Sequence, residues 1–167
     1  MSIRADISEM SQKEVDRVLR DTTTMFGPIE MVICCAAMSK PKMFLQSEFK
    51  EYEHHMNLNF LGSLKIAQAC AKMMSKNKTQ GRVVLIGDPI ASHYVIPSMS
   101  PYSCSKAALE ELAYHMKSEL EPFSIKVHYF LPPPMDTNLL QEQKKMYPML
   151  TRILMKNQTA ASPEYAA

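Results

Sequence analysis

The sequence predicts an α/β fold built on a parallel sheet. Three apolar segments rich in β-branched residues are separated by long segments with helical periodicity; they span residues 29–37, 81–87 and 125–131. A strand buried on both faces reads as a continuous apolar run, as these do, rather than as an alternation. Strands joined by long helical crossovers are typical of parallel sheets.

Length and composition exclude several classes of protein. The chain has 167 residues, which predicts one domain, with 46% hydrophobic and 22% charged residues. Its net charge of +2, with no basic block, gives nucleic-acid binding no electrostatic support. The longest apolar run, near residues 29–38, is too short to span a bilayer, and the first residues hold no signal-peptide core.

Two helices can be bounded at their start from local signals. Ser11 with Glu14 three residues later forms a capping box, and Gly27-Pro28 ends the helix that it opens. Residues 3–8, before it, read as the end of a strand entering a loop. Ser100-Pro101 opens another helix, with Ser100 as its N-cap, which Pro122 ends.

Two more helices follow from periodicity. Apolar residues recur every three or four positions over residues 47–76, which predicts one long helix with Asn59 on its apolar side. Residues 139–156 predict a last helix. Pro132-Pro133-Pro134 breaks the third strand.

The cysteines and histidines show no metal-binding spacing. None of the four cysteines forms Cys-x-x-Cys, so we expect reduced thiols, with Cys34 and Cys35 as small buried residues. The five histidines are scattered and are expected to be surface or packing residues. We therefore predict no metal site.

Tyr102 and Lys106 carry the clearest chemical signal. Four residues apart on a helix, they share a face. A neighbouring ammonium would lower the pKa of the phenol and let it exchange a proton with a carbonyl or an alcohol. The alternative is a surface tyrosine and lysine that happen to have this spacing.

With Asn59 upstream and the proline-rich turn downstream, residues 5–140 resemble the short-chain dehydrogenase/reductases. The resemblance implies a three-layer, Rossmann-like parallel sheet and one domain over residues 1–167, of which the first βαβ unit is missing. It implies catalytic roles for Asn59, Tyr102 and Lys106. It also implies an NADPH site formed by Asp6, Ile7, Cys34, Ala36, Ala37, Tyr102, Lys106, Pro132, Pro133 and Thr137.

Several segments look most like the 3-ketosphinganine reductases within that family. They are residues 27–31, 59–63, 81–84 and 131–137. This likeness implies NADPH-dependent reduction of a long-chain ketone on the cytosolic face of the endoplasmic reticulum. It also implies oligomers formed through the helices predicted over residues 47–76 and 100–121.

The sequence departs from the family pattern at three places. No glycine-rich phosphate loop is present among its four glycines, and both ends look truncated against the family. Gly87-Asp88-Pro89 stands near the position of the catalytic serine, and Ser92 is the nearest hydroxyl and a weak candidate for a substrate contact. Asp88 would repel an oxyanion or, equally, serve as a turn residue before proline. Cys34 and Ala37 replace an asparagine and a glycine.

These features leave three functions open. The first is a ketone reductase in which Tyr102 donates the proton. The second is a catalytically impaired homologue that pairs with a complete enzyme through its long helices. The third is a reductase of another lipid or small carbonyl compound.

Overall fold

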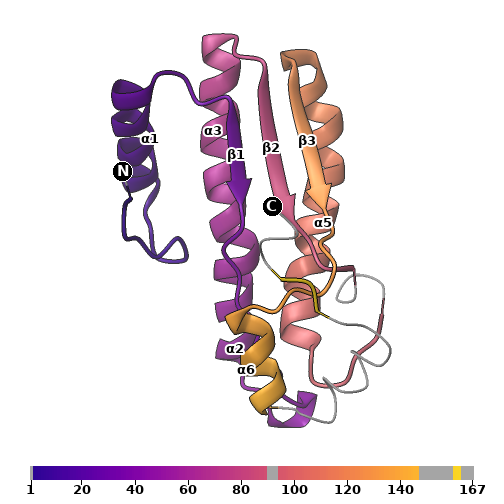
Figure 1. The fold of residues 1–167 in the computed structure, drawn as a ribbon. Helices are drawn as coiled ribbons and strands as arrows, with labels where there is room; N and C mark the ends of the chain where they lie inside the picture. The colour runs from indigo at the N-terminus through magenta and orange to yellow at the C-terminus, as the bar shows by residue number, and fades with distance from the viewer. Residues whose placement is uncertain (1, 90–93, 147–159, 163–167) are drawn as a thin grey trace.

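The sheet has three parallel strands in chain order (Figure 1). The computed structural model describes residues 2–89, 94–146 and 160–162. Its strands are β1 (Met31–Cys34), β2 (Gly81–Ile86) and β3 (Ile125–Phe130). Cys34 lies beside Leu85, and Leu85 beside Tyr129, so the carboxyl ends are in step. The predicted α/β fold is confirmed, and the first strand is shorter than the apolar run that predicts it.

The capping box forms as predicted and opens helix α1 (Gln12–Phe26). The Ser11 hydroxyl accepts from the Glu14 amide at 3.3 Å, and the Glu14 carboxylate accepts from the Ser11 amide at 2.8 Å. The strand predicted over residues 3–8 is wrong. Those residues form a turn, with the amides of Glu9 and Met10 donating to the Asp6 carbonyl, and no described strand lies beside them to pair with.

The long helix predicted over residues 47–76 is interrupted. Helix α2 (Phe49–His55) runs into a π-helical segment (Met56–Gly62), and α3 (Ser63–Asn77) continues from it. A π-helical turn widens the helix without ending it, so the apolar spacing hides the change. A Cβ on Gly62 would lie 3.0 Å from the Ile7 side chain, so Gly62 lets the turn before α1 pack against this segment.

Helix α5 (Ser100–Leu120) packs against β3, with Met99 rather than Ser100 as its N-cap. A short 3₁₀ turn, Glu121–Phe123, joins it to β3, and another, Phe44–Gln46, precedes α2. The last described helix, α6 (Asn138–Met146), is shorter than predicted, and residues 147–159 lie outside the described part. The predicted stripe on α5 is buried at Tyr102, Lys106, Leu109, Ala113 and Met116.

Helices α3 and α5 cover one face of the sheet and lie behind it in Figure 1. Val83, Leu85 and Val127 are buried on that face. On the other face, Met31 is 47% exposed and Ile33 is 57% exposed. Burial of this strand on both faces is therefore a wrong prediction for the described residues, because no described helix covers the second face.

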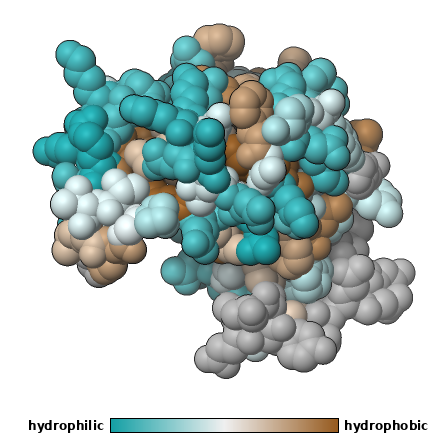
Figure 2. Space-filling model, turned by 90° about the horizontal axis from the view of Figure 1, so that it is seen from above, coloured by the Kyte–Doolittle hydropathy of each residue, from teal (hydrophilic) through white to brown (hydrophobic). Residues whose placement is uncertain are grey.

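Polar side chains surround the apolar interior. Figure 2, seen from above, shows hydrophilic residues in teal around patches of apolar side chains in brown. Cys34 and Cys70 lie inside with free thiols, whereas Cys35 and Cys104 are exposed. The predicted burial of Cys35 is wrong, because it follows β1 on the uncovered side. Among the described helices, none is long and apolar enough to cross a membrane.

Candidate functional site

Tyr102 and Lys106 lie in the first turns of α5, which begins near the carboxyl ends of the strands. Both are buried: Tyr102 is 4% exposed and Lys106 is 3% exposed. The Lys106 ammonium lies 5.8 Å from the centre of the Tyr102 ring and donates to the Ile86 carbonyl at 2.8 Å. The surface alternative for this pair is therefore excluded. The end of β2 holds the lysine in place, and the lysine lies against the tyrosine ring.

Asp88, just beyond β2, accepts a hydrogen bond from the Tyr102 hydroxyl at 2.9 Å. Burial raises the pKa of Tyr102 well above its usual value, and the charge and hydrogen bond of Asp88 raise it further. The sequence predicts a lowered pKa from the Lys106 ammonium, and that direction is wrong. The cause is local: the Lys106 ammonium bonds the Ile86 carbonyl, and the Tyr102 hydroxyl donates its hydrogen bond to the Asp88 carboxylate.

The pKa of Lys106 is set by two opposing effects. Removal from water lowers its pKa, and the negative charge of Asp88 acts in the opposite direction. Asp88 therefore lies close to both members of the pair. The Asp88 charge raises the pKa of the Tyr102 phenol and also opposes the fall in the pKa of Lys106.

Asn59 occupies the π-helical segment and is 0% exposed. Its amide oxygen accepts from the Met38 amide at 2.8 Å, and its amide nitrogen donates to the Met38 carbonyl at 3.0 Å. The same nitrogen donates to the Ser105 hydroxyl at 2.9 Å, which donates to the Tyr102 carbonyl at 2.7 Å. Asn59 thereby joins the chain after β1 to the start of α5.

The structure adds residues that sequence reasoning missed. Ser105 links the Asn59 side chain to the Tyr102 backbone carbonyl, and its place between Tyr102 and Lys106 on the same helix could have suggested that role. Tyr129 on β3 covers Gly87, since a Cβ there would lie 2.3 Å from its ring. Its charge also raises the pKa of Tyr102. Only the register of β2 and β3 brings Tyr129 to this position.

Three of the residues predicted to bind NADPH lie before α1 and at the end of β1. Asp6 is exposed, and its carboxylate accepts from the Ser8 hydroxyl at 2.6 Å and from the Ser8 amide at 2.9 Å, which together lower the pKa of Asp6. Ile7 packs against Gly62. Cys34 lies inside, with its thiol directed to the Ser63 carbonyl at 3.7 Å. Its side chain thus contacts α3 and the core.

The remaining predicted residues lie after β1 and β3. Ala37 and Pro132 are half-buried, whereas Ala36 and Pro133 are exposed. The half-buried Thr137 accepts from the Leu140 amide at 3.5 Å at the start of α6. The Gln143 side chain on α6 donates to the Ser39 hydroxyl at 2.8 Å, which brings α6 against the chain after β1. Ser92 lies outside the described residues.

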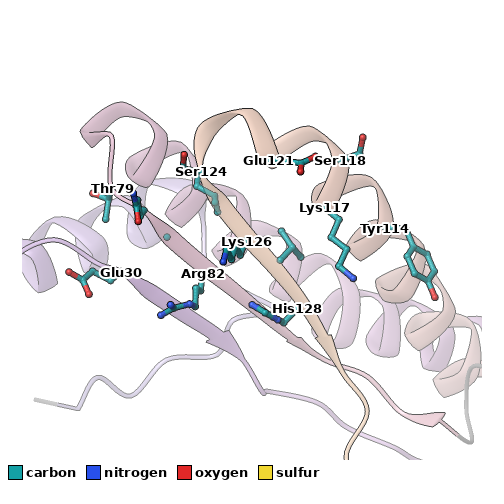
Figure 3. Close-up of a pocket in the computed structure, with 14 residues that line it drawn as sticks. Glu30, Thr79, Arg82, Tyr114, Lys117, Ser118, Glu121, Ser124, Lys126 and His128 are labelled. Carbon is teal, nitrogen blue, oxygen red and sulfur yellow. The ribbon is translucent and has the colours of Figure 1, made fainter.

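A cavity of about 1180 Å³ lies at the other end of the sheet (Figure 3). Arg82, Lys126 and His128 line it from β2 and β3, and Tyr114 and Lys117 line it from α5. None of Asn59, Tyr102 and Lys106 lines it. It therefore plays no part in the arrangement around Tyr102. In the described part of the chain, no group of acidic, histidine or cysteine side chains could hold a metal ion.

The comparisons with known proteins agree with this arrangement. Residues 1–148 match the family model described as short chain dehydrogenase. The chain is 29% identical over its whole length to proteins named 3-ketodihydrosphingosine reductase from Mus musculus and Bos taurus. It spans about half of those relatives, 49% of each.

Solved structures show the same architecture. A short-chain dehydrogenase from Streptomyces avermitilis is 26% identical, with a TM-score of 0.72 over 82% of this chain and 50% of that one. A short-chain type dehydrogenase/reductase from Mycobacterium marinum covers 99% of this chain, with 64% of its own length, a TM-score of 0.84 and 24% identity. With its parallel sheet and its Tyr102–Lys106 helix, the chain belongs to the short-chain dehydrogenase/reductase family.

Proposed function

We propose that this chain carries the proton-transfer centre of an NADPH-dependent carbonyl reductase whose substrate is 3-ketosphinganine or a similar long-chain ketone. One observation carries the proposal. Asn59 is hydrogen-bonded through Ser105 to the Tyr102 backbone carbonyl, and the Tyr102 ring lies against the Lys106 ammonium one helical turn further on. The likeness of the whole of this chain to about half of the 3-ketodihydrosphingosine reductases supports the choice of substrate.

The residues present fit the nicotinamide and ribose end of such a cofactor. The buried Lys106 ammonium has donors to spare beside the Ile86 carbonyl, and a ribose hydroxyl would suit them. The exposed Ala36 and the half-buried Ala37 and Thr137 lie around the same end of the sheet and would line the rest of that end. The sequence holds no glycine-rich loop for the pyrophosphate.

The chemistry divides between the cofactor and the chain. A nicotinamide held at this end of the sheet would supply the hydride for the carbonyl carbon. Tyr102 donates its phenolic proton to the carbonyl oxygen, so that the phenol O–H bond breaks as the alcohol O–H bond forms. Lys106 favours the resulting phenolate by its charge. Asn59 holds the chain after β1 and the start of α5 in register, which fixes the direction of the phenol.

Two further features belong to the same proposal. Work on a membrane lipid would place the protein at the cytosolic face of the endoplasmic reticulum, as its likeness to sphingolipid enzymes suggests. The same likeness suggests an oligomer that pairs through α3 and α5. Cross-linking of the purified chain and fractionation of cells would test these two points.

The proposed activity is tested with NADPH, 3-ketosphinganine and two variants of the purified full chain. Tyr102→Phe removes the proton donor but keeps the ring, and we expect it to lose turnover. Tyr114→Phe is the matched control, because it makes the same change on the same helix at an exposed position. Equal turnover in the two variants would refute the assignment.

A second candidate is a catalytically impaired homologue that pairs with a complete reductase. The hydrogen bond from Tyr102 to Asp88 favours this candidate, because the phenolic proton that the reaction needs is held by the Asp88 carboxylate. This candidate predicts no NADPH oxidation by the purified chain and co-elution with a full-length 3-ketodihydrosphingosine reductase on gel filtration. A chain that elutes alone from that mixture would exclude it.

A further inference from the structure

Asp88 is the feature of the site that the proposed reaction does not explain. It lies just past the end of β2 and is half-buried, and its carboxylate accepts a hydrogen bond from the hydroxyl of the buried Tyr102 at 2.9 Å. The hydroxyl carries one proton, and that proton is directed at Asp88. While Asp88 is ionised, the same proton cannot point at a substrate carbonyl.

Loss of that proton would also place two negative charges side by side. A phenolate on Tyr102 would lie within hydrogen-bond distance of the Asp88 carboxylate, and like charges this close oppose one another strongly. Within the described residues, Tyr129 on β3 also acts on the phenol, and Cys35 after β1 acts on Lys106. The Lys106 ammonium lies against the phenol ring and bonds the Ile86 carbonyl.

We propose that Asp88 is a positioning residue that controls Tyr102, so that the proposed reductase donates its proton only when Asp88 is itself protonated. A protonated Asp88 donates its hydrogen to the Tyr102 oxygen and frees the phenolic proton for the substrate. As that proton moves to the carbonyl oxygen, the Asp88 proton passes to the phenol oxygen. Asp88 is left as a carboxylate, and water returns its proton.

This control has two consequences for the reaction, and both rest on the proposed function. Turnover in the direction of reduction rises as the pH falls. The reverse reaction, alcohol oxidation, runs through the same step backwards: the Asp88 carboxylate takes the Tyr102 proton as Tyr102 takes a proton from the alcohol. Alcohol oxidation therefore needs the carboxylate form of Asp88 and rises as the pH rises.

Substitution of Asp88 tests the inference with two measurements. Asp88→Asn keeps the size of the side chain and donates to Tyr102 permanently. We expect turnover of the purified full chain with NADPH and 3-ketosphinganine at about pH 8 to rise about tenfold or more. The reason is that no hydrogen bond to a charged group has to break first. We also expect the rate to lose its rise toward low pH. Asp21→Asn, an exposed change on α1, is the control and should behave as wild type.

The second measurement does not need activity. Alkaline titration of tyrosine absorbance, with Tyr102→Phe to identify one of the seven tyrosines, reports the pKa of Tyr102 directly. Asp88→Asn should lower that pKa, because it removes the carboxylate that raises it. An unchanged Tyr102 titration overturns the inference. So does an Asp88→Asn rate that keeps the wild-type pH profile.

The two proposals fail separately. If no variant turns over 3-ketosphinganine, the proposed function fails, and the titration still decides whether Asp88 controls the proton on Tyr102. If Tyr102→Phe loses turnover but Asp88→Asn does not raise it, the proposed function stands and the role of Asp88 is refuted.

Discussion

Asn59 offers a sharp test of how the site is held together. Its side chain makes three hydrogen bonds in a fully buried position, two to the Met38 backbone and one to Ser105. Asn59→Ala removes all three. A typical intramolecular hydrogen bond contributes about 0.5–1.5 kcal/mol net, and water can reach the half-buried Met38. We therefore expect the free energy of unfolding to fall by about 2–4 kcal/mol.

The matched control is Asn57→Ala, the same change two residues away in the same π-helical segment. Asn57 is exposed, so its free energy of unfolding should fall by less than about 0.5 kcal/mol. Ser105→Ala removes two hydrogen bonds, the one from Asn59 and the one to the Tyr102 carbonyl, so its loss should fall between the two, at about 1–2 kcal/mol. The graded order follows from the number of bonds that each variant loses.

Urea unfolding followed by circular dichroism measures these differences, since the chain has no tryptophan to report by fluorescence. With a slope near about 2 kcal/mol per molar urea, Asn59→Ala should lower the midpoint by about 1–2 M. If Asn59→Ala and Asn57→Ala have the same midpoint, the hydrogen bonds do not hold the site as described.

Two further predictions concern buried titratable groups. Burial lowers the pKa of His55, whose ring bonds the Glu51 carbonyl at 2.6 Å and the Lys40 amide at 3.2 Å. The unfolded chain then binds the proton first, so stability should fall as the pH drops below about 6.5. Urea midpoints at several pH values should show this fall, and His55→Gln should reduce it; an equal fall in that variant would contradict the assignment. Burial also raises the pKa of Cys34 to about 12 and that of Cys70 to about 11. Iodoacetamide labelling of the native chain, read by peptide mass spectrometry, should therefore spare these two thiols and modify the exposed cysteines. Stability should also fall as the pH rises above about 8.5, and labelling of Cys34 at the rate of Cys35 would refute its burial.

Local signals in the sequence predict most of the fold. The Ser11 capping box and the apolar runs of β1, β2 and β3 depend on neighbouring residues, and the structure contains them. Apolar content alone does not say which face of a strand is covered. For that reason the burial of Cys35 and of the whole first strand was predicted wrongly.

The site is predicted less completely, because its geometry depends on residues far apart in the chain. The spacing of Tyr102 and Lys106 predicts their shared helix face correctly. The direction of the Tyr102 pKa depends on Asp88, fourteen residues earlier in the chain, and on burial that only the folded chain provides. The π-helical segment around Asn59 keeps the apolar spacing of an ordinary helix, so periodicity does not reveal it.

Hydride transfer itself tests the central claim most directly. The full chain is incubated with 3-ketosphinganine and NADPH deuterated at the transferable position, and the sphinganine formed is analysed by mass spectrometry. We predict a product that carries one deuterium from the wild type and from Tyr114→Phe, and none from Tyr102→Phe. A deuterated product from Tyr102→Phe at the wild-type rate would contradict the role of Tyr102 as the proton donor.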